Sequence, residues 1–476
     1  MELSVPDGRM FVGGEWVAAR GGETIAVLDP ATGKVLRHVP RGTAEDVDAA
    51  VRAAHEAFPV WRDLGPTRRG ELMRAWAAAC DAAGAELATT ESMEVGRPYK
   101  GPSRVGATLT YMAGAADKVL GTTLPTNRTD MLGLTLREPY GVCGCIVPWN
   151  TPATLMIGEV APAIAAGNTV VVKPAEDAPL TCLRLAALAV EAGIPPGVVN
   201  VVTGYGPEAG AALPEHPLVR YMAFTGSPET GSAVMRACAR NLVPLHLELG
   251  GKSPQVVMAD ADLDRAVPTI VRWLTTNAGQ VCFAGTRLLV QRPVRDEVVD
   301  RVAEAMRAVR IGPWFENVDM GPLISAKQRE RVLGYVAAGL AEGARLVTGG
   351  GAPPGAGFFV EPTLFDQVDP GMRIAQEEIF GPVLSAVTFD DAAEALRIAN
   401  GTRYGLAASV WTANVSTAVR FARGLEAGQV YVNTYGPAGA VGTPFGGYRG
   451  SGFGRTGGAE TILERTQVKS IVIDGS

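Results

Sequence analysis

The residue with the clearest chemical potential is Cys282, which lies in the stretch NAGQVCFAGTR between a helix-like and a strand-like segment. Gly279, Ala284 and Gly285 flank it closely, so that a ligand can approach the backbone at this point. The stretch carries few charges, and any activation of the thiol must therefore come from elsewhere in the fold. Taken alone, this window favours a small buried hydrophobic residue.

Three polar side chains follow strand-like or glycine-rich segments. Glu248 ends the apolar run LHLELGG, where a carboxylate is costly unless it is paired or used, so we expect its pKa to be raised. A backbone N–H could satisfy it instead. Asn150 follows Pro148-Trp149, and its amide could donate to an oxyanion or close a turn. Glu378, in EEIFGPV, could hold a ribose or cap a loop.

Two further motifs are typical of nucleotide binding. Residues 224–231 read FTGSPETG, and Gly226 and Ser227 would let a phosphate approach the free N–H groups of a helix N-terminus. The spacing departs from G-x-G-x-x-G, so an ordinary capped turn is the alternative. Residues 173–176 (KPAE) end a buried strand, where an acid can accept both hydroxyls of a ribose. Here the alternative is a solvated loop.

These residues need a scaffold, and the chain alternates between strand-like and helical segments from residue 141 onwards. This pattern predicts an α/β fold with parallel sheets and right-handed crossovers. A second α/β set follows Gly250-Gly251, where we place a soft boundary. Thr129–Arg137 and Thr466–Ile473 are isolated strands that need partners. The expected strands of the first set are Gly141–Val147, Asn168–Lys173, Val198–Val202, Arg220–Phe224 and Val243–Leu249.

The composition excludes several classes of protein. The 476 residues, 47% of them apolar, are enough for two or three domains. A net charge of −6 argues against a nucleic-acid or anionic-membrane partner, and no apolar run is long enough to span a membrane. No signal peptide is visible, and six scattered cysteines suggest a reducing cytoplasm. Neither a metal-ligand spacing nor a G-x-S-x-G elbow is present, so we expect no metal.

Considered together, the motifs resemble those of the NAD(P)-dependent aldehyde dehydrogenase family across nearly the full chain. ELGGKSP and GQVC at this separation are highly specific, and they outweigh the structural alternatives for Cys282 and Glu248. The motifs are Pro148-Trp149-Asn150, Lys173-Pro174-Ala175-Glu176, Phe224-Thr225-Gly226-Ser227, Leu247-Glu248-Leu249-Gly250-Gly251-Lys252, Gly279-Gln280-Val281-Cys282, Glu378-Ile379-Phe380-Gly381-Pro382 and Pro444-Phe445-Gly446-Gly447.

The resemblance implies a Rossmann-like cofactor domain, an α/β catalytic domain and a small β arm that reaches a neighbouring subunit. The arm would pair Thr129–Arg137 with the C-terminal strand, and the protein would be a cytoplasmic homodimer or homotetramer. The implied segments are 1–120 and 140–250 for the NAD-binding domain, 251–450 for the catalytic domain, and 121–139 with 451–476 for the oligomerisation arm.

The resemblance also implies a mechanism. The thiolate of Cys282 attacks the aldehyde, and the Asn150 amide and the Cys282 N–H hold the oxyanion. Hydride loss to NAD leaves a thioester, and Glu248 activates the water that hydrolyses it. Lys173 belongs both to this catalytic set and to the cofactor site, for which NADP is a less favoured ligand than NAD. The implied cofactor contacts are Trp149, Lys173, Glu176, Gly206, Phe224, Gly226, Ser227, Leu249, Glu378 and Phe380.

The sequence differs from that of many family members at the positions where the resemblance implies the entrance to the substrate tunnel. Thr151, Thr154 and Gly158 are small, and the loop 436–442 is rich in small residues. Since no arginine pair suited to a carboxylate is evident, we expect a medium or bulky neutral aldehyde. Two alternatives are a member that transfers the acyl group to coenzyme A, and a family fold kept as a non-catalytic binding or structural protein. Glu248 argues against the first, and the intact set of Cys282, Glu248 and Asn150 argues against the second.

Overall fold

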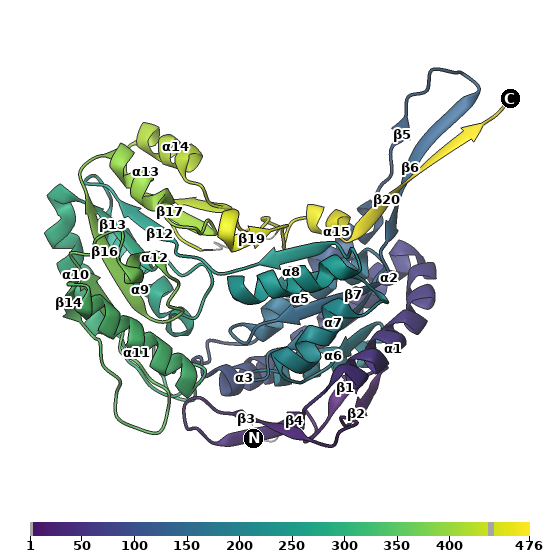
Figure 1. Ribbon diagram of the computed structural model, residues 1–476, viewed down its shortest axis with the longest axis horizontal. Coiled ribbons are helices and arrows are strands. Elements are labelled where there is room, and N and C mark those ends of the chain that lie inside the picture. Colours follow the sequence, from purple (N-terminus) through teal and green to yellow (C-terminus); the bar gives the residue numbers. More distant parts are fainter. Residues whose placement is uncertain (1–2, 437–441) are drawn as a thin grey trace.

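The computed structural model describes residues 3–436 and 442–476, which form two large sheets covered by helices and a projecting arm (Figure 1). The alternation of buried strands and amphipathic helices produces this α/β architecture, as the sequence predicts. In the described part of the chain, no helix is long and apolar enough to cross a membrane.

The first sheet has eight strands in the order β19-β11-β10-β7-β8-β9-β1-β2. β7 to β11 pair in parallel, whereas the edge strands β1, β2 and β19 are antiparallel to their neighbours. The five strands expected from residue 141 onwards are therefore confirmed. Their bounds are β1 (Met10–Val12), β2 (Glu15–Val17), β7 (Val142–Val147), β8 (Thr169–Pro174), β9 (Val199–Val201), β10 (Val219–Thr225), β11 (Leu245–Glu248) and β19 (Gly452–Phe453).

Helices cover both faces of this sheet, and a two-stranded hairpin of β3 (Thr24–Leu28) and β4 (Val35–Pro40) lies near the N-terminus (Figure 1). The first helix begins at a capping box, in which the Thr43 N–H donates to Asp46 Oδ2 at 2.9 Å. The helices are α1 (Ala44–Asp63), α2 (Gly65–Ala82), α3 (Gly84–Val95), α4 (Val105–Ala115), α5 (Pro152–Ala165), α6 (Leu180–Glu191), α7 (Ala211–Glu215) and α8 (Pro228–Arg240).

The second sheet has seven strands in the order β14-β15-β16-β13-β12-β17-β18, and all its pairs are parallel except β14 with β15. Its strands are β12 (Pro254–Val257), β13 (Arg287–Gln291), β14 (Arg345–Thr348), β15 (Thr363–Asp366), β16 (Val383–Phe389), β17 (Ala407–Trp411) and β18 (Gln429–Val432). Its helices are α9 (Leu263–Thr275), α10 (Arg295–Arg307), α11 (Ala326–Ala341), α12 (Arg373–Gln376), α13 (Ala392–Asn400) and α14 (Val415–Gly424).

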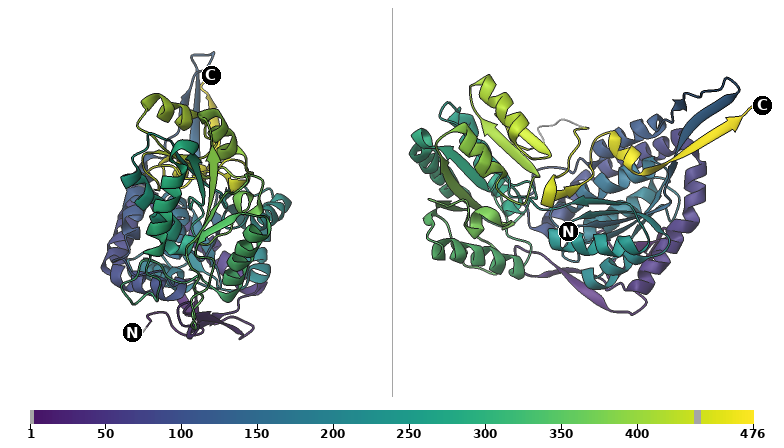
Figure 2. Two further views of the ribbon diagram at one scale, coloured as in Figure 1. Left: turned by 90° about the vertical axis from the view of Figure 1, so that its left-hand side faces the viewer. Right: turned by 45° about the horizontal axis from the view of Figure 1, so that its top comes forward.

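The arm consists of β5 (Thr123–Leu124), β6 (Met131–Pro139) and β20 (Thr466–Asp474), of which β20 follows the short helix α15 (Glu460–Glu464). β20 and β6 pair antiparallel over nine residues, with Ser470 opposite Thr135. The pairing expected between the isolated strand and the C-terminal strand is thus present. The arm projects away from the body of the molecule and carries the C-terminus (Figures 1 and 2).

The chain crosses from the first sheet to the second between β11 and β12, at residues 249–253. Glu248 is the last residue of β11, and the loop that contains Cys282 joins α9 to β13 of the second sheet. The carboxyl ends of parallel strands are where ligands bind in α/β sheets. The junction of the two sheets therefore brings the candidate residues together.

Candidate active site

The loop before Cys282 has an unusual backbone that only particular residues tolerate. Asn277, Ala278 and Gly279 have φ angles of +49°, +53° and +74°, in the left-handed region. A Cβ at position 279 would lie 2.4 Å from the backbone of Gly381, so a glycine is required there. This short turn, η3 (Thr276–Gly279), fixes the course of the chain into Cys282.

A buried network of amides attaches Asn150 to this loop. The Asn150 Nδ2 donates to the Gln280 carbonyl at 3.0 Å, and the Asn277 Nδ2 donates to the Asn150 carbonyl at 2.9 Å. The Gln280 side chain in turn accepts from the Ile324 N–H at 2.9 Å. Since an amide NH₂ has two hydrogens, the Asn150 Nδ2 keeps one that this network does not use. That hydrogen is available to an oxyanion formed beside Cys282.

Glu248 lies at the end of β11 with only 2% of its surface exposed, and neither carboxyl oxygen has a hydrogen-bond partner among the described residues. Burial raises the pKa of Glu248 well above its ordinary value, and the nearby Glu159 carboxylate raises it further, whereas Arg455 opposes them. The raised pKa expected from the sequence is confirmed. Glu248 is therefore a buried acid whose carboxyl oxygens receive no hydrogen bond from any described side chain or backbone group.

The thiol of Cys282 is not activated by its protein surroundings. Burial and the carboxylates of Glu248 and Glu378 raise the pKa of Cys282 well above its ordinary value, while the backbone N–H groups of Phe283 and of Cys282 itself act in the opposite direction. The thiol therefore rests in its protonated form, and a base is needed before it can attack. A Cβ at Gly251 would lie 2.7 Å from the Cys282 carbonyl, so the crossing that follows Glu248 runs beside Cys282.

Lys173 and Glu176 meet at the carboxyl end of β8, where the Nζ of Lys173 lies 3.3 Å from Glu176 Oε2. Lys173 is buried, and this lowers its pKa although Glu176 opposes the effect. Its stem also lies near Gly210, since a Cβ there would be 3.9 Å from Lys173 Cδ. Gly206 begins the same turn, η2 (Gly206–Gly210), with open space where its Cβ would be.

Gly226 and Ser227 link β10 to α8 next to Glu248. The Gly226 N–H donates to the Glu248 carbonyl at 3.1 Å, and the Ser227 hydroxyl caps α8 by accepting from the Thr230 N–H at 3.2 Å. A Cβ at position 226 would meet the Phe224 ring at 2.6 Å, so the backbone and the ring pack closely. Leu249 follows Glu248, and its N–H donates to the Ser451 carbonyl at 3.1 Å.

Glu378, which lies between α12 and β16 of the second sheet, contacts the crossing between the two sheets. Its Oε1 accepts from the Gly251 N–H at 3.1 Å, and a Cβ at Gly250 would lie 2.0 Å from its Oε2. Burial raises the pKa of Glu378 to about 7, although the Gly251 N–H, Lys252 and Arg331 oppose the shift. Beside it, the rings of Trp149 and Phe380 stack edge to face with their centroids 5.3 Å apart.

These residues fit a dinucleotide. The start of α8 at Gly226-Ser227 suits a phosphate group. Lys173 and Glu176 lie at the end of β8, where a ribose can bind, and Glu378 is a buried acid at the crossing between the sheets. The oxygens of Glu248 lack partners among residues 3–436 and 442–476, and Glu248 ends β11 directly before this crossing. The structure thus brings Cys282, Asn150 and Glu248 to the junction of the two sheets, whereas Lys173, the fourth catalytic candidate, lies at the end of β8 beside Glu176. It places the cofactor candidates along the carboxyl edge of the first sheet and at the crossing.

An aromatic cluster beside Cys282 was not predicted, although Phe445, one of its members, lies in one of the family motifs. The Phe283 ring lies 5.2 Å from Trp273 and 5.6 Å from Phe445, and the Tyr435 hydroxyl donates to the Phe283 carbonyl at 2.5 Å. Tyr431 extends the cluster, with its ring 5.4 Å from Tyr435. These aromatic residues come from separate parts of the chain, so no local sequence pattern joins them. Together they form an apolar wall next to the nucleophile.

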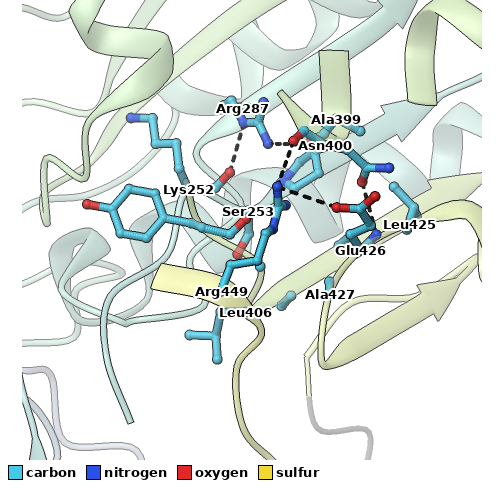
Figure 3. A pocket seen from close by; sticks show the side chains of 15 residues that line it. Lys252, Ser253, Arg287, Ala399, Asn400, Leu406, Leu425, Glu426, Ala427 and Arg449 are labelled. Atoms are coloured by element: carbon cyan, nitrogen blue, oxygen red, sulfur yellow. Dashed lines mark hydrogen bonds and ion pairs between the residues drawn. The ribbon is translucent and has the colours of Figure 1, made fainter. Parts of the chain in front are cut away.

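A polar pocket lies next to Lys252 and Ser253, just after the crossing between the sheets, and is separate from the candidate site (Figure 3). The Arg287 guanidinium donates to the carbonyls of Lys252, Ile398 and Ala399, at 2.8, 2.8 and 2.6 Å, and so caps α13. Arg449 donates to the Asn400 carbonyl at 3.0 Å in the same pocket. Cys282, Asn150, Glu248 and Lys173 are not among the residues that line this pocket.

In the described ranges, no group of three His, Cys, Asp or Glu side chains could hold a metal ion, and all six cysteines are free.

The chain is similar to known proteins over nearly its whole length. A sequence model described as the aldehyde dehydrogenase family matches residues 16–471. The phenylacetaldehyde dehydrogenase of Pseudomonas fluorescens is 44% identical over 98% of this chain and 95% of that protein. A P. syringae indole-3-acetaldehyde dehydrogenase mutant in complex with NAD⁺ and IAA is 42% identical, with a TM-score of 0.96 over 100% of this chain and 97% of that chain.

An NAD⁺ complex of an aldehyde dehydrogenase from Bacillus cereus is similar as well. It is 41% identical, with a TM-score of 0.96 over 98% of this chain and 97% of that chain. The match of the family model, the identity of the relatives and the shared fold all extend over nearly the whole sequence. The chain therefore belongs to the aldehyde dehydrogenase family.

Proposed function

We propose that this protein oxidises an aldehyde to the carboxylic acid with NAD, and that Cys282, Asn150 and Glu248 carry out the chemistry. The observation that supports it most is the buried Glu248, whose two oxygens lack partners in the described chain and which ends β11 directly before the crossing to the second sheet. A buried acid of this kind is costly for stability, and a role in proton transfer explains why it is kept.

The residues act in sequence. Cys282 Sγ, after losing its proton, attacks the aldehyde carbon. The free hydrogen of the Asn150 Nδ2 and the Cys282 N–H donate to the oxyanion. NAD, when bound, supplies the hydride acceptor that turns the bound aldehyde into a thioester on Cys282. Glu248 then takes a proton from the water that attacks the thioester, and this releases the acid.

The cofactor is held by residues on both sides of the junction. Lys173 and Glu176 would hold the adenosine ribose, and Glu378, with Phe380 packed beside it, would hold the nicotinamide ribose. Because Glu176 would repel a 2′-phosphate, we expect NAD to be preferred over NADP. The remaining contacts, close to the pyrophosphate and along the carboxyl edge of the sheet, would come from Trp149, Gly206, Phe224, Gly226, Ser227 and Leu249.

For the substrate, we propose a medium or bulky neutral aldehyde. The aromatic wall of Trp273, Phe283 and its neighbours is apolar, and there is open space where a Cβ at Gly158 would be. Thr154 is exposed on the same helix. Within the loop 436–442, residues 437–441 lie outside the described residues. The similarity to enzymes named for phenylacetaldehyde and indole-3-acetaldehyde supports an arylacetaldehyde as a first choice.

We also propose a homodimer or homotetramer in which the arm contacts a second copy. Leu132 and Ile473 lie directly opposite each other on one face of the arm and are 47% and 50% exposed. Such a pair of exposed apolar side chains is typical of an interface. The cofactor domain, catalytic domain and arm would occupy the segments expected from the sequence. A cytoplasmic location is consistent with six free cysteines.

The test is a panel of neutral and acidic aldehydes with NAD or NADP, followed by NADH absorbance and product analysis. Cys282→Ala is the control, and it should fold and bind NAD but form no NADH. Acid formed without coenzyme A supports the proposal. Acyl-coenzyme A formed only when coenzyme A is added would favour the acyl-transfer alternative. No NADH with any aldehyde would favour a binding or structural protein.

A further inference from the structure

Gln280 is a buried polar residue two positions before Cys282, and the reaction proposed above assigns no role to it. It is 0% exposed, although glutamine is mostly found at the surface of proteins. A buried amide is costly unless its donors and acceptors are paired. The contacts of Gln280 therefore indicate why an amide is kept at this position.

The side chain of Gln280 joins the turn before Cys282 to the start of α11. Its Nε2 donates to the Asn277 carbonyl at 2.9 Å, and the same carbonyl accepts from the Gln280 backbone N–H at 3.0 Å. Its Oε1 accepts from the N–H of Ile324, the residue before the N-cap Ser325, at 2.9 Å. Because both ends of the amide are bound to backbone groups, the residue has little freedom to rotate, and its own carbonyl keeps one direction.

The backbone carbonyl of Gln280 faces the side chain of Asn150. It accepts from the Asn150 Nδ2 at 3.0 Å, and it also accepts from the Asn277 Nδ2 at 3.4 Å. A carbonyl oxygen accepts hydrogen bonds and donates none, so it pairs with the NH₂ end of an amide and repels the oxygen end. The Gln280 carbonyl therefore determines which way the Asn150 amide is turned.

The orientation of the Asn150 amide decides whether it can act on an oxyanion. Of its two polar ends, only the Nδ2 carries hydrogens, and the angle between its two N–H bonds is fixed. With one N–H directed at the Gln280 carbonyl, the direction of the other is fixed as well. The Asn150 Oδ1 is buried and has no hydrogen-bond partner among the described residues, so it does not contribute to holding the amide in place.

We propose that Gln280 is a positioning residue that turns the Asn150 amide so that one N–H is directed at the oxyanion. The side chain of Gln280 anchors its backbone, and the backbone carbonyl holds one hydrogen of the Asn150 Nδ2. The other hydrogen stays free for the aldehyde oxygen. No proton or electron moves in this step. The inference rests on the role proposed for Asn150 in the reaction.

Loss of the Gln280 side chain would leave Asn150 present but free to turn away. A displacement of about 1 Å at a catalytic group can lower a rate about 100-fold. We therefore expect a kinetic loss smaller than the one caused by removing Asn150 itself. The loss should appear in the step that forms the oxyanion, and the binding of NAD should be unaffected.

The test replaces Gln280 by methionine, which has a similar length but is apolar, so that both anchors are lost. Gln291→Met is the matched control, because Gln291 forms the same two kinds of bond at the far end of β13. Its Nε2 donates to the Asp390 carbonyl at 3.3 Å, and its Oε1 accepts from the Ala259 N–H at 2.8 Å. Stopped-flow absorbance with NAD and phenylacetaldehyde gives the rate of the first NADH, and calorimetry gives the Kd of NAD.

We expect Gln280→Met to form the first NADH about 10- to 100-fold more slowly than the unmodified enzyme, with an unchanged Kd of NAD. Gln291→Met should match the unmodified enzyme in both measurements. In an Asn150→Ala enzyme, adding Gln280→Met should slow the first NADH by less than about threefold, because the side chain that Gln280 positions is then gone. An unchanged rate in Gln280→Met would overturn the proposal, as would a loss of equal size with and without the Asn150 side chain.

Gln280→Asn decides the matter if the methionine variant does not fold. Asparagine keeps the amide but is one methylene shorter, so it cannot reach both the Asn277 carbonyl and the Ile324 N–H, and the same outcomes support or overturn the proposal. If Asn150→Ala itself leaves the rate of the first NADH unchanged, the role proposed for Asn150 is wrong. If Asn150→Ala slows it and the Gln280 variants do not, only the positioning by Gln280 is wrong, so the two failures are distinct.

Discussion

Replacing Asn150 by alanine separates the catalytic contribution of this residue from its structural one. The substitution removes the side-chain amide that we place at the oxyanion and also removes its hydrogen bond to the Gln280 carbonyl, at 3.0 Å. The two losses differ in size and are measured by different experiments. We therefore expect a large kinetic effect together with a small effect on stability.

The structure sets the size of each effect. Loss of one oxyanion donor typically lowers kcat by about 100- to 1,000-fold, or about 3–4 kcal/mol in the transition state. Loss of one hydrogen bond lowers stability by about 1 kcal/mol, and the penalty is larger when a buried carbonyl is left unpaired. The Gln280 carbonyl keeps a second donor, since the Asn277 Nδ2 lies at 3.4 Å. We therefore expect Asn150→Ala to lower the free energy of unfolding by only about 1 kcal/mol.

Initial rates with NAD give kcat and kcat/KM, and urea unfolding gives the change in stability. Asn200→Ala is the matched control. Asn200 is also buried, and its Nδ2 donates to the carbonyls of Val170 and Gly197 at 3.1 and 2.7 Å. This control should lose stability without a comparable loss of kcat. If Asn150→Ala lost only stability, with kcat within threefold of the unmodified enzyme, Asn150 would be a structural amide and the oxyanion assignment would be wrong.

Three other predictions follow from the charges and surfaces of the molecule. Glu176→Gln should narrow the preference for NAD over NADP about tenfold, or ~1.4 kcal/mol, in paired kcat/KM measurements, because the charge that repels a 2′-phosphate is gone. The value of kcat/KM should rise between pH 6 and 9, because the raised pKa values of Cys282 and Glu248 keep both groups protonated at lower pH; a flat profile would argue against these two groups. Leu132→Asp combined with Ile473→Asp should shift the mass measured by light scattering to that of a monomer, and an unchanged mass would place the interface elsewhere.

The sequence predicts those parts of the fold that depend on local patterns. The buried strand β8, the capped start of α1 and the alternation of strands and helices all follow from periodicity and capping. β12, β15 and β18 were not predicted. Each has four residues. Their place in the sheet depends on pairing with distant strands.

Contacts between distant residues account for what the sequence does not reveal at the site. The rise in the pKa of Glu248 was expected from an acid at the end of an apolar strand, yet its Glu159 neighbour comes from α5, far away in the sequence. The cluster of His246, Glu159 and Arg465 joins residues up to 306 positions apart. The aromatic wall beside Cys282 is built in the same way. No spacing within one segment encodes these contacts.

The most direct test of the account is a stopped-flow experiment on Glu248→Gln with NAD and a reactive aldehyde. Glutamine keeps the size of the side chain and one acceptor but cannot act as a base. We predict a burst of about one NADH per active site, followed by a steady rate about 100- to 10,000-fold below that of the unmodified enzyme. Mass spectrometry of the stalled enzyme should show the acyl group on Cys282. An unchanged steady rate, with no acyl group on Cys282, would contradict the account.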